Sequence, residues 1–302
     1  MLPDLAPIGP VSRPILRFAP SPNGYLHLGH AYSALLNARL ARRLGGVVLL
    51  RIEDIDIGRC RPAYAEALLE DLAWLGLAYP QPVRRQSDHF ATYAAVLDEL
   101  RRRGLLYPCF CSRAEIAAAV GRRGETPRDP DGALLYPGTC RALAPAEVER
   151  RLAAGTLHTL RLRMDEACAL CSEGLTMRVC DCDCREGSVA VDPRCWGDVV
   201  LGRRDVPTSY HLAVTVDDAL QGVTHVVRGA DLLAATAIHR LLQRLLGLAE
   251  PCYHHHRLIT DDDGRKLAKS VESLPLRQLR ARGITAGDVR RDLGFGDLEA
   301  GA

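Results

Sequence analysis

Two histidines, His27 and His30, lie three residues apart directly after a loop of turn-forming residues, Ala19-Pro20-Ser21-Pro22-Asn23-Gly24. The loop joins a short apolar run to a helical pattern. A helix start offers free backbone N–H groups and partial positive charge, which favour phosphate. Histidines there can donate hydrogen bonds to phosphate oxygens as charge builds at an α-phosphorus, and Gly29 lets a base or ribose approach the backbone. The pattern indicates a nucleotide site, although H-x-G-H alone also fits a chance match with a core histidine.

A second candidate site lies late in the chain, in Lys266-Leu267-Ala268-Lys269-Ser270. It follows the turn Asp261-Asp262-Asp263-Gly264. Two lysines on such a loop can close over a triphosphate and neutralise the leaving pyrophosphate. Alone, this segment equally fits a basic surface loop. The combination of an early H-x-G-H and a late K-x-x-K-S is far more specific than either part.

Alternating strands and helices position these motifs. The apolar runs at 15–18 and 47–52 have strand length, and the second suits a buried parallel strand. Helical patterns cover 28–44, ended by Gly45-Gly46, then 62–75 with proline in the first turn, then 88–103 with Asp88 as a possible cap. This order predicts an α/β fold with a Rossmann-like, doubly wound parallel sheet.

The middle of the chain breaks this pattern, because residues 108–196 are rich in Cys, Arg, Gly and Pro with weak periodicity. Apolar patterning returns at 199–201, 211–216 and 223–227, followed by a helix at 232–246. We therefore predict a first half of the catalytic domain at 14–107, an insertion at 108–195, a second half at 196–260, and a mobile loop with short C-terminal helices at 261–302.

Composition is that of an ordinary globular protein, with 302 residues, 47% of them hydrophobic and 25% charged. No apolar run is long enough for a membrane helix, and Met1 to Pro14 lacks the apolar core of a secretory signal. A cytoplasmic location without membrane contact is the resulting expectation. The net charge of +2 neither requires nor excludes a nucleic-acid partner.

The 11 cysteines are clustered, which favours metal binding or free thiols over disulfides. Cys109, Cys111 and Cys140 can place sulfur on three corners of a tetrahedron. Tyr136 could supply a fourth oxygen ligand, although chemistry alone would favour Cys or His there. A later group can also bind zinc, or form part of an insertion without metal, or compete for the same ion: Cys168, Cys171, Cys180, Cys182 and Cys184.

Taken together, the two lysine- and histidine-bearing motifs resemble the HIGH and KMSKS signatures of class I aminoacyl-tRNA synthetases. The second departs from the usual form at Leu267 and Ala268, while both lysines remain. Four further segments resemble the glutamyl/glutaminyl subgroup in their order along the chain and in their residues: Arg17–Pro22, Arg51–Asp56, Tyr210–Ala213 and Arg228–Leu233.

This resemblance implies a set of roles. Catalysis would involve His27, His30, Lys266 and Lys269, and ATP binding His27, Gly29, His30 and Lys269. Glutamate would be bound by Arg17, Phe18, Ala19, Pro20, Ser21, Glu53, Tyr210 and Arg228. The chemistry agrees, because guanidinium groups pair with carboxylates and Glu53 suits an ammonium group. Which arginine meets which carboxylate stays open, as does any ATP-site role for His254-His255-His256.

The insertion resembles that of the glutamyl-queuosine tRNA(Asp) synthetases, which carry the pattern C-x-C…Y-x-x-x-C. This implies one structural zinc held by Cys109, Cys111, Tyr136 and Cys140. The chain ends 32 residues after Ser270, which leaves no room for the anticodon-binding domain of a full glutamyl-tRNA synthetase. The family's activity would be tRNA-independent activation of L-glutamate by ATP with Mg2+, then transfer to the queuosine base in the anticodon of tRNA(Asp). A monomer is expected.

Three other functions remain compatible with parts of the pattern. A minimal glutamyl-tRNA synthetase would charge a tRNA 3′ end instead. A small-molecule nucleotidyltransferase also uses H-x-G-H, but does not need the set Arg17, Glu53, Tyr210 and Arg228. A zinc-dependent RNA-binding protein without catalysis would not need His27, His30 and Lys269.

Overall fold

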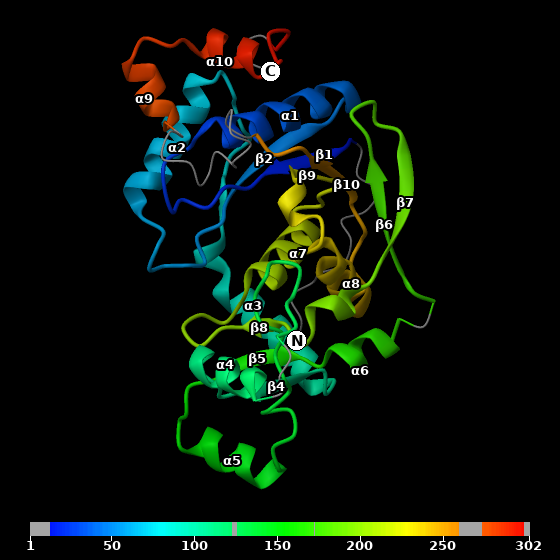
Figure 1. The fold of residues 1–302 in the computed structure, drawn as a ribbon. Coiled ribbons are helices and arrows are strands. Elements are labelled where there is room, and N and C mark those ends of the chain that lie inside the picture. Colours follow the sequence, from blue (N-terminus) through cyan, green and yellow to red (C-terminus); the bar gives the residue numbers. More distant parts are fainter. Residues whose placement is uncertain (1–12, 123–125, 172, 260–273, 299–302) are drawn as a thin grey trace.

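The computed structural model describes residues 13–122, 126–171, 173–259 and 274–298. Their main sheet has seven strands in the order β3-β2-β1-β9-β10-β6-β7 (Figure 1). All neighbouring pairs are parallel except β6 with β7. The predicted doubly wound parallel sheet is therefore confirmed.

Five strands form the part of this sheet that carries the predicted motifs, and the first two have the predicted bounds. They are β1 (Ile15–Phe18), β2 (Val47–Ile52), β3 (Arg84–Arg85), β9 (His225–Gly229) and β10 (Cys252–His256). Strand β1 leads through helix α1 toward β2 on one side, while β9 leads through helix α8 toward β10 on the other. The chain thus reverses its winding between β1 and β9, which is where doubly wound sheets bind ligands.

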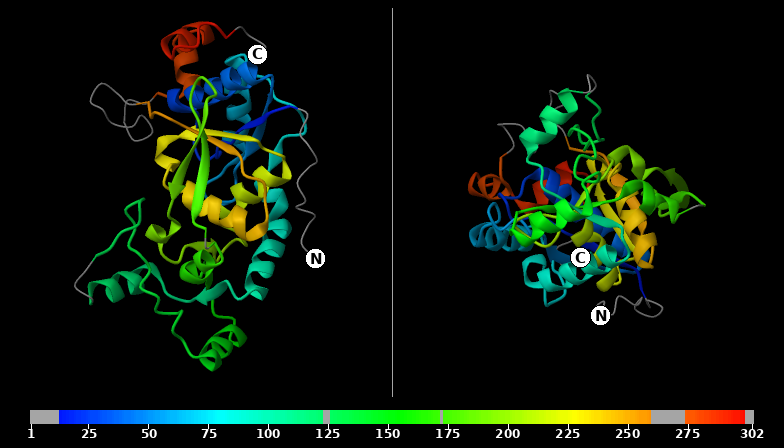
Figure 2. Two further views of the ribbon diagram at one scale, coloured as in Figure 1. Left: turned by 90° about the vertical axis from the view of Figure 1, so that its right-hand side faces the viewer. Right: turned by 90° about the horizontal axis from the view of Figure 1, so that it is seen from below.

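Helices cover both faces of the sheet (Figures 1 and 2). On one face, α1 (Leu28–Leu44) and α2 (Pro62–Trp74) pack with the C-terminal helices α9 (Leu276–Ala281) and α10 (Ala286–Asp292). The other face carries α3 (Phe90–Arg102), α7 (Tyr210–Leu220) and α8 (Thr236–Leu246). Among the described residues, no helix is both long and apolar enough to span a membrane.

A small antiparallel sheet lies beyond α3 and α7, in the order β4-β5-β8. Its strands are β4 (Leu106–Cys109), β5 (Thr159–Leu162) and β8 (Val200–Gly202). Helices α4 (Arg113–Gly121), α5 (Pro145–Ala153) and α6 (Met164–Ala169) accompany it. The hairpin of β6 (Leu175–Cys180) and β7 (Glu186–Val191) instead joins the main sheet beside β10. Residues 108–195 therefore contribute to both sheets.

Two expected helix starts are wrong. Asp88 does not cap α3, because it lies inside a short 3-10 turn, Gln86–His89, that precedes the helix. Asp54 holds this turn by accepting hydrogen bonds from Ser87, at 2.9 Å from its N–H and 2.8 Å from its hydroxyl. The helix predicted at 232–246, α8, begins at Thr236, not at residue 232, after a 3-10 turn at Ala230–Leu232.

Candidate active site

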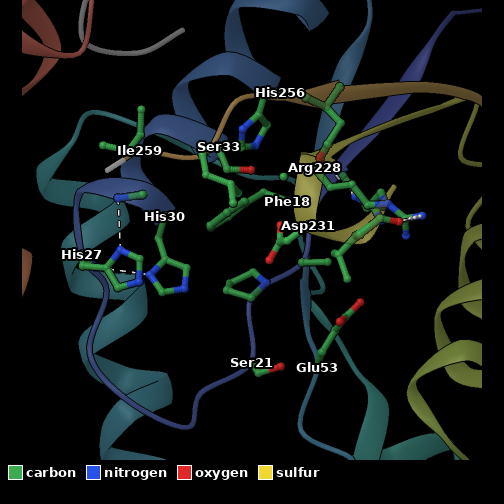
Figure 3. A pocket seen from close by; sticks show the side chains of 18 of the residues that line it. Phe18, Ser21, His27, His30, Ser33, Glu53, Arg228, Asp231, His256 and Ile259 are labelled. Carbon is green, nitrogen blue, oxygen red and sulfur yellow. Dashed lines mark hydrogen bonds between the residues drawn. The ribbon is translucent and has the colours of Figure 1, made fainter. Parts of the chain in front are cut away.

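A cavity of about 470 Å³ opens at the carboxyl ends of β1, β2, β9 and β10. Eleven of its lining residues are those predicted for glutamate and ATP: Arg17, Phe18, Ala19, Pro20, Ser21, His27, Gly29, His30, Glu53, Tyr210 and Arg228. Figure 3 shows His27 and His30 on one side of this cavity and Arg228 with Glu53 on the other. We refer to these sides as the histidine end and the arginine end.

The predicted lysines Lys266 and Lys269 lie outside the described residues.

At the arginine end, the guanidinium of Arg228 is buried among neutral groups. It donates to the hydroxyl of Thr236 at 2.8 Å and to the carbonyl of Leu232 at 3.2 Å, and it contacts His239 Nδ1 at 3.1 Å and His255 Nε2 at 3.4 Å. Within the described part of the chain, no carboxylate forms a salt bridge with it. A buried cation without an ionic partner is a strong binding site for an anion.

The surrounding histidines do not compensate for that charge. Burial, and then the Arg228 guanidinium, lower the pKa of His211 to about 4 and that of His255 to about 3. The same causes place the pKa of His239 well below its usual value. All three rings are therefore neutral near pH 7, and they accept or share hydrogen bonds without adding further positive charge.

Arg17 and Glu53, by contrast, belong to a closed network of buried charges. Asp218 Oδ1 accepts from Arg17 Nε at 3.1 Å and from Arg51 Nη1 at 2.7 Å. Arg51, with 0% exposure, also donates to Glu53 Oε1 at 2.9 Å. The network fixes the positions of Arg17 and Glu53, whose side chains form the cavity wall.

The pKa values of Glu53 and Asp218 are shifted in opposite directions. Burial raises the pKa of Glu53, and the nearby Arg51 and Arg17 only partly offset it. Burial acts on Asp218 as well, but the guanidinium groups of Arg17 and Arg51 together hold the pKa of Asp218 below its usual value. Asp218 is therefore a permanent counter-ion to the two arginines. The protonation of Glu53, by contrast, depends on the charge of the group that enters the cavity.

At the histidine end, both rings cap helix α1. Nδ1 of His27 accepts from the Gly29 N–H at 3.1 Å, and Nδ1 of His30 accepts from the His27 N–H at 3.3 Å. A neutral imidazole that accepts through Nδ1 carries its proton on Nε2. The capping box thus sets the tautomer in which each ring donates through Nε2, as phosphate binding requires.

Gly29 has a steric function that differs from the expected one. A Cβ at this position would meet the His27 ring, with Cε1 at 2.9 Å and Nδ1 at 3.1 Å. Glycine is therefore needed for the capping ring to lie over the backbone, whatever it also permits a nucleotide to do.

Sequence reasoning missed several residues of this site. Ser33 and Asp231 line the cavity, and Arg51 with Asp218 forms the buried network behind it. His256, from the histidine run whose role was left open, also lines the cavity. One signal was available for Asp218, because Asp217-Asp218 interrupts the otherwise apolar pattern of α7. Both carboxylates are buried, and Asp217 accepts from Arg84 at 2.8 Å.

The predicted metal ligands also converge, at the end of β4. The sulfur atoms of Cys109, Cys111 and Cys140 lie within 4.8 Å of one another. The Tyr136 hydroxyl lies 3.7 Å from Cys111 Sγ and accepts from the Cys140 N–H at 2.7 Å. Cys140 Sγ accepts from the Phe110 N–H at 3.3 Å, an arrangement that stabilises thiolate. Burial raises the pKa of Cys111 to about 11, a cost that a divalent cation would offset. The donor set fits a single zinc ion.

The later cysteines do not form one cluster. Cys168 and Cys171 are buried in the core beneath α8, whereas Cys180, Cys182 and Cys184 lie at the turn between β6 and β7. The six-residue strand β6 separates the two groups by about 17 Å. The C-x-x-C and C-x-C pairs therefore cannot share an ion.

Comparison with known proteins assigns the family. Residues 15–285 match the family model described as "tRNA synthetases class I (E and Q), catalytic domain". This chain belongs to that family and is therefore a ligase of the aminoacyl-tRNA synthetase class.

Within this family, the chain is similar to proteins of two names. A protein of Rhodobacter capsulatus named glutamyl-Q tRNA(Asp) synthetase is 48% identical, over 93% of this chain and 100% of that protein. One of Nitratidesulfovibrio vulgaris with the same name is 41% identical, over 90% and 83% respectively. A glutamate tRNA ligase structure from Elizabethkingia meningosepticum, in complex with its amino acid, gives a TM-score of 0.68 at 28% identity over 90% of this chain. This chain spans 53% of that structure's length.

Proposed function

We propose that this chain activates L-glutamate with ATP in the absence of tRNA, and transfers the glutamyl group to the queuosine base in the anticodon of tRNA(Asp). The observation that carries the choice of amino acid is the unpaired charge of Arg228. Four arginines and three carboxylates lie buried or half-buried at the arginine end, and among them only Arg228 has no carboxylate partner in the described part of the chain: Arg17, Arg51, Arg84, Arg228, Glu53, Asp217 and Asp218. Glutamate carries two carboxylates and one ammonium, so its net negative charge balances this set.

The geometry supports a division of work within the cavity. One carboxylate of glutamate pairs with Arg228, the ammonium group faces Glu53, and Tyr210 and Ser21 complete the orientation. The other carboxylate then points toward the histidine end. There it attacks the α-phosphorus of ATP in line, which forms glutamyl-adenylate and releases pyrophosphate. Magnesium accompanies the ATP.

His27 and His30 act where charge develops. Their Nε2–H groups donate to the phosphate oxygens, and the start of α1 adds its positive end. Lys266 and Lys269 would neutralise the pyrophosphate. In the second step, a hydroxyl of queuosine attacks the acyl carbon of the adenylate, which forms an ester, breaks the bond to the phosphate and releases AMP, with the hydroxyl proton passing to the departing phosphate. That carbon is already activated, so this step depends mainly on proximity.

We assign a structural zinc to Cys109, Cys111, Tyr136 and Cys140, on the strength of their convergence and chemistry. The ion would fix the start of the segment 108–195, which we propose as the region that meets the tRNA. It takes no part in adenylate formation, because Cys109 ends a strand of the small sheet and none of the four ligands lines the cavity.

The test has two stages. ATP–pyrophosphate exchange without tRNA should require glutamate and fail with glutamine or aspartate. Labelled glutamate with ATP is then offered to two tRNA pools, one containing queuosine and one from cells unable to make it. Label confined to the queuosine-containing pool supports the proposal.

Equal labelling of both pools would instead identify a glutamyl-tRNA synthetase that charges the 3′ end. That alternative is favoured by a Nitrosococcus oceani relative named glutamate–tRNA ligase 2, which is 40% identical over 94% of this chain and 61% of that protein. Exchange that occurs without glutamate would reject both functions.

A further inference from the structure

A second group of metal-binding side chains lies on the main sheet, away from the cavity. One ligand atom from each of Glu186, His225 and Cys252 lies within 4.8 Å of the others. Cys180 lies on the adjacent strand β6, where its thiol interacts with that of Cys252. These four residues come from four adjacent strands, β9, β10, β6 and β7. We propose that they form a second zinc-type metal site, the sheet site, distinct from the Cys109 cluster.

Strand register places the four side chains on one face of the sheet. His225 pairs with Cys252 between β9 and β10, and Cys180 pairs with Glu186 between β6 and β7. Tyr253 pairs with Val179, so Cys252 and Cys180 point to the same face of the sheet. The site is therefore a product of the sheet order and joins residues far apart in the sequence.

The donor set and the spacing both suit zinc. Zinc lies about 2.3 Å from thiolate sulfur and about 2.0–2.1 Å from imidazole nitrogen, so ligands of one ion lie under about 4.6 Å apart. For Glu186, His225 and Cys252, the observed limit of 4.8 Å needs side-chain shifts of only a few tenths of an ångström, and Cys180 would move in as the fourth ligand. Two sulfurs, one nitrogen and one oxygen make a complete tetrahedral set.

The surroundings also match a metal site. Histidine ligands usually hold their second ring nitrogen against an oxygen, and Nδ1 of His225 lies 2.9 Å from the Thr224 hydroxyl. Arg178 donates to Glu186 Oε2 at 2.7 Å. Two thiolates and one carboxylate exceed the charge of Zn2+ by one, and the guanidinium of Arg178 balances that excess.

The sheet site would clamp the β6–β7 hairpin to the strands that carry the cavity. Arg228 lies three residues after His225 in β9, and His256 lies four after Cys252 in β10. An ion here therefore fixes the near ends of the strands whose far ends line the cavity. The clamp needs no contact with substrate.

Metal content of the purified full chain is the first test. We expect about two zinc ions per chain by elemental analysis, and about one in Cys180→Ser and in His225→Gln. Cys182→Ser is the matched control, because this exposed thiol lies in the same turn but outside the donor set. It should keep the wild-type content. Equal metal content in wild type, Cys180→Ser and His225→Gln would overturn the proposal.

Thiol protection gives an answer even where a variant folds poorly. In the wild-type chain stripped with chelator, added Zn2+ should slow alkylation of Cys180 and Cys252 at least about tenfold, with Cys182 unaffected. Peptide mass spectrometry reads each site separately. A Cys180–Cys252 disulfide in the stripped protein under reducing conditions, or unchanged alkylation on adding Zn2+, would contradict a metal site.

Discussion

The two ends of the cavity are built in opposite ways. At the histidine end, His27 and His30 belong to one helix start, and their geometry is set by hydrogen bonds within three residues. At the arginine end, Arg17 from β1, Glu53 just after β2 and Arg228 from β9 come together, and Arg17 is held by a charge 201 residues away in sequence. The comparison teaches that the proposed ATP site is built locally, whereas the proposed amino-acid site depends on the whole sheet. Each prediction below tests one side of that contrast.

The largest effect is expected for Asp218→Asn, because it leaves Arg17 and Arg51 buried without their shared counter-ion. Loss of one partner from such a buried group destabilises by about 3–5 kcal/mol. Chemical denaturation of variant and wild type measures the difference.

The pH dependence of stability in the same variant tests the charge state of Asp218. The pKa of Asp218 is lowered in the folded chain from a usual value of 3.8, so its stabilisation is present above that pH and is lost as pH falls through the folded pKa. The stability difference between wild type and Asp218→Asn should therefore shrink only below about pH 4. A difference that shrinks near neutral pH would show that Asp218 is not the permanent counter-ion.

Arg228→Ala is expected to lower kcat/KM for glutamate by at least about 100-fold, since a buried ion pair with substrate is worth about 2–5 kcal/mol. The KM for ATP should change little, because Arg228 lies at the opposite end of the cavity from His27 and His30. Pyrophosphate exchange at varied glutamate and varied ATP separates the two. Arg228→Lys serves as the charge-preserving control. If Arg228→Ala impaired the use of ATP as much as the use of glutamate, the proposed separation of the two binding sites would be contradicted.

His27→Asn should lower kcat by about 100-fold with little change in stability. Asparagine can still cap α1, but it lacks the Nε2–H donor, and one such donor is worth about 10²–10³ in rate. His27→Ala removes both the cap and the donor, so it should lose about 1 kcal/mol of stability in addition. If His27→Asn keeps the wild-type rate while His27→Ala loses both rate and stability, the ring acts mainly as a cap.

Gly29→Ala is expected to have the smallest effect, a loss of about tenfold in kcat, because the added Cβ displaces the His27 ring that it would meet at 2.9 Å. Gly24→Ala is the matched control in the same loop region, since a Cβ there meets nothing within 4 Å. Equal rates for both variants and wild type would show that the His27 ring position is not critical.

The same contrast explains what could be predicted from the sequence. Strands Ile15–Phe18 and Val47–Ile52 and helix Leu28–Leu44 were predicted within their observed bounds, because apolar period, turn residues and the stop at Gly45 all lie nearby. The roles of His27 and His30 at the start of this helix could be predicted for the same reason, because the signals lie in the neighbouring residues. The start of α8 was not, because the Arg228 guanidinium binds the Leu232 carbonyl and the Thr236 hydroxyl there.

Long-range partners account for the rest. Nothing near Arg51 in sequence shows that it will meet Asp218, and nothing near Cys180 shows that it will meet Cys252. Such pairs follow from strand order, which the sequence pattern limits only to a doubly wound class. The cysteine spacing of 168–184 was misleading for this reason, because it suggested neighbours that β6 holds apart.

The central position of β1 has a consequence for how the chain is made. Ile15 donates its N–H to the Thr224 hydroxyl, 209 residues later. At about 5–20 residues per second, a ribosome takes roughly 10–40 s to synthesise that interval. Throughout it, one edge of the first strand pair is unpaired and open to other chains. A nascent chain of this design gains from a chaperone that covers that edge until β9 emerges.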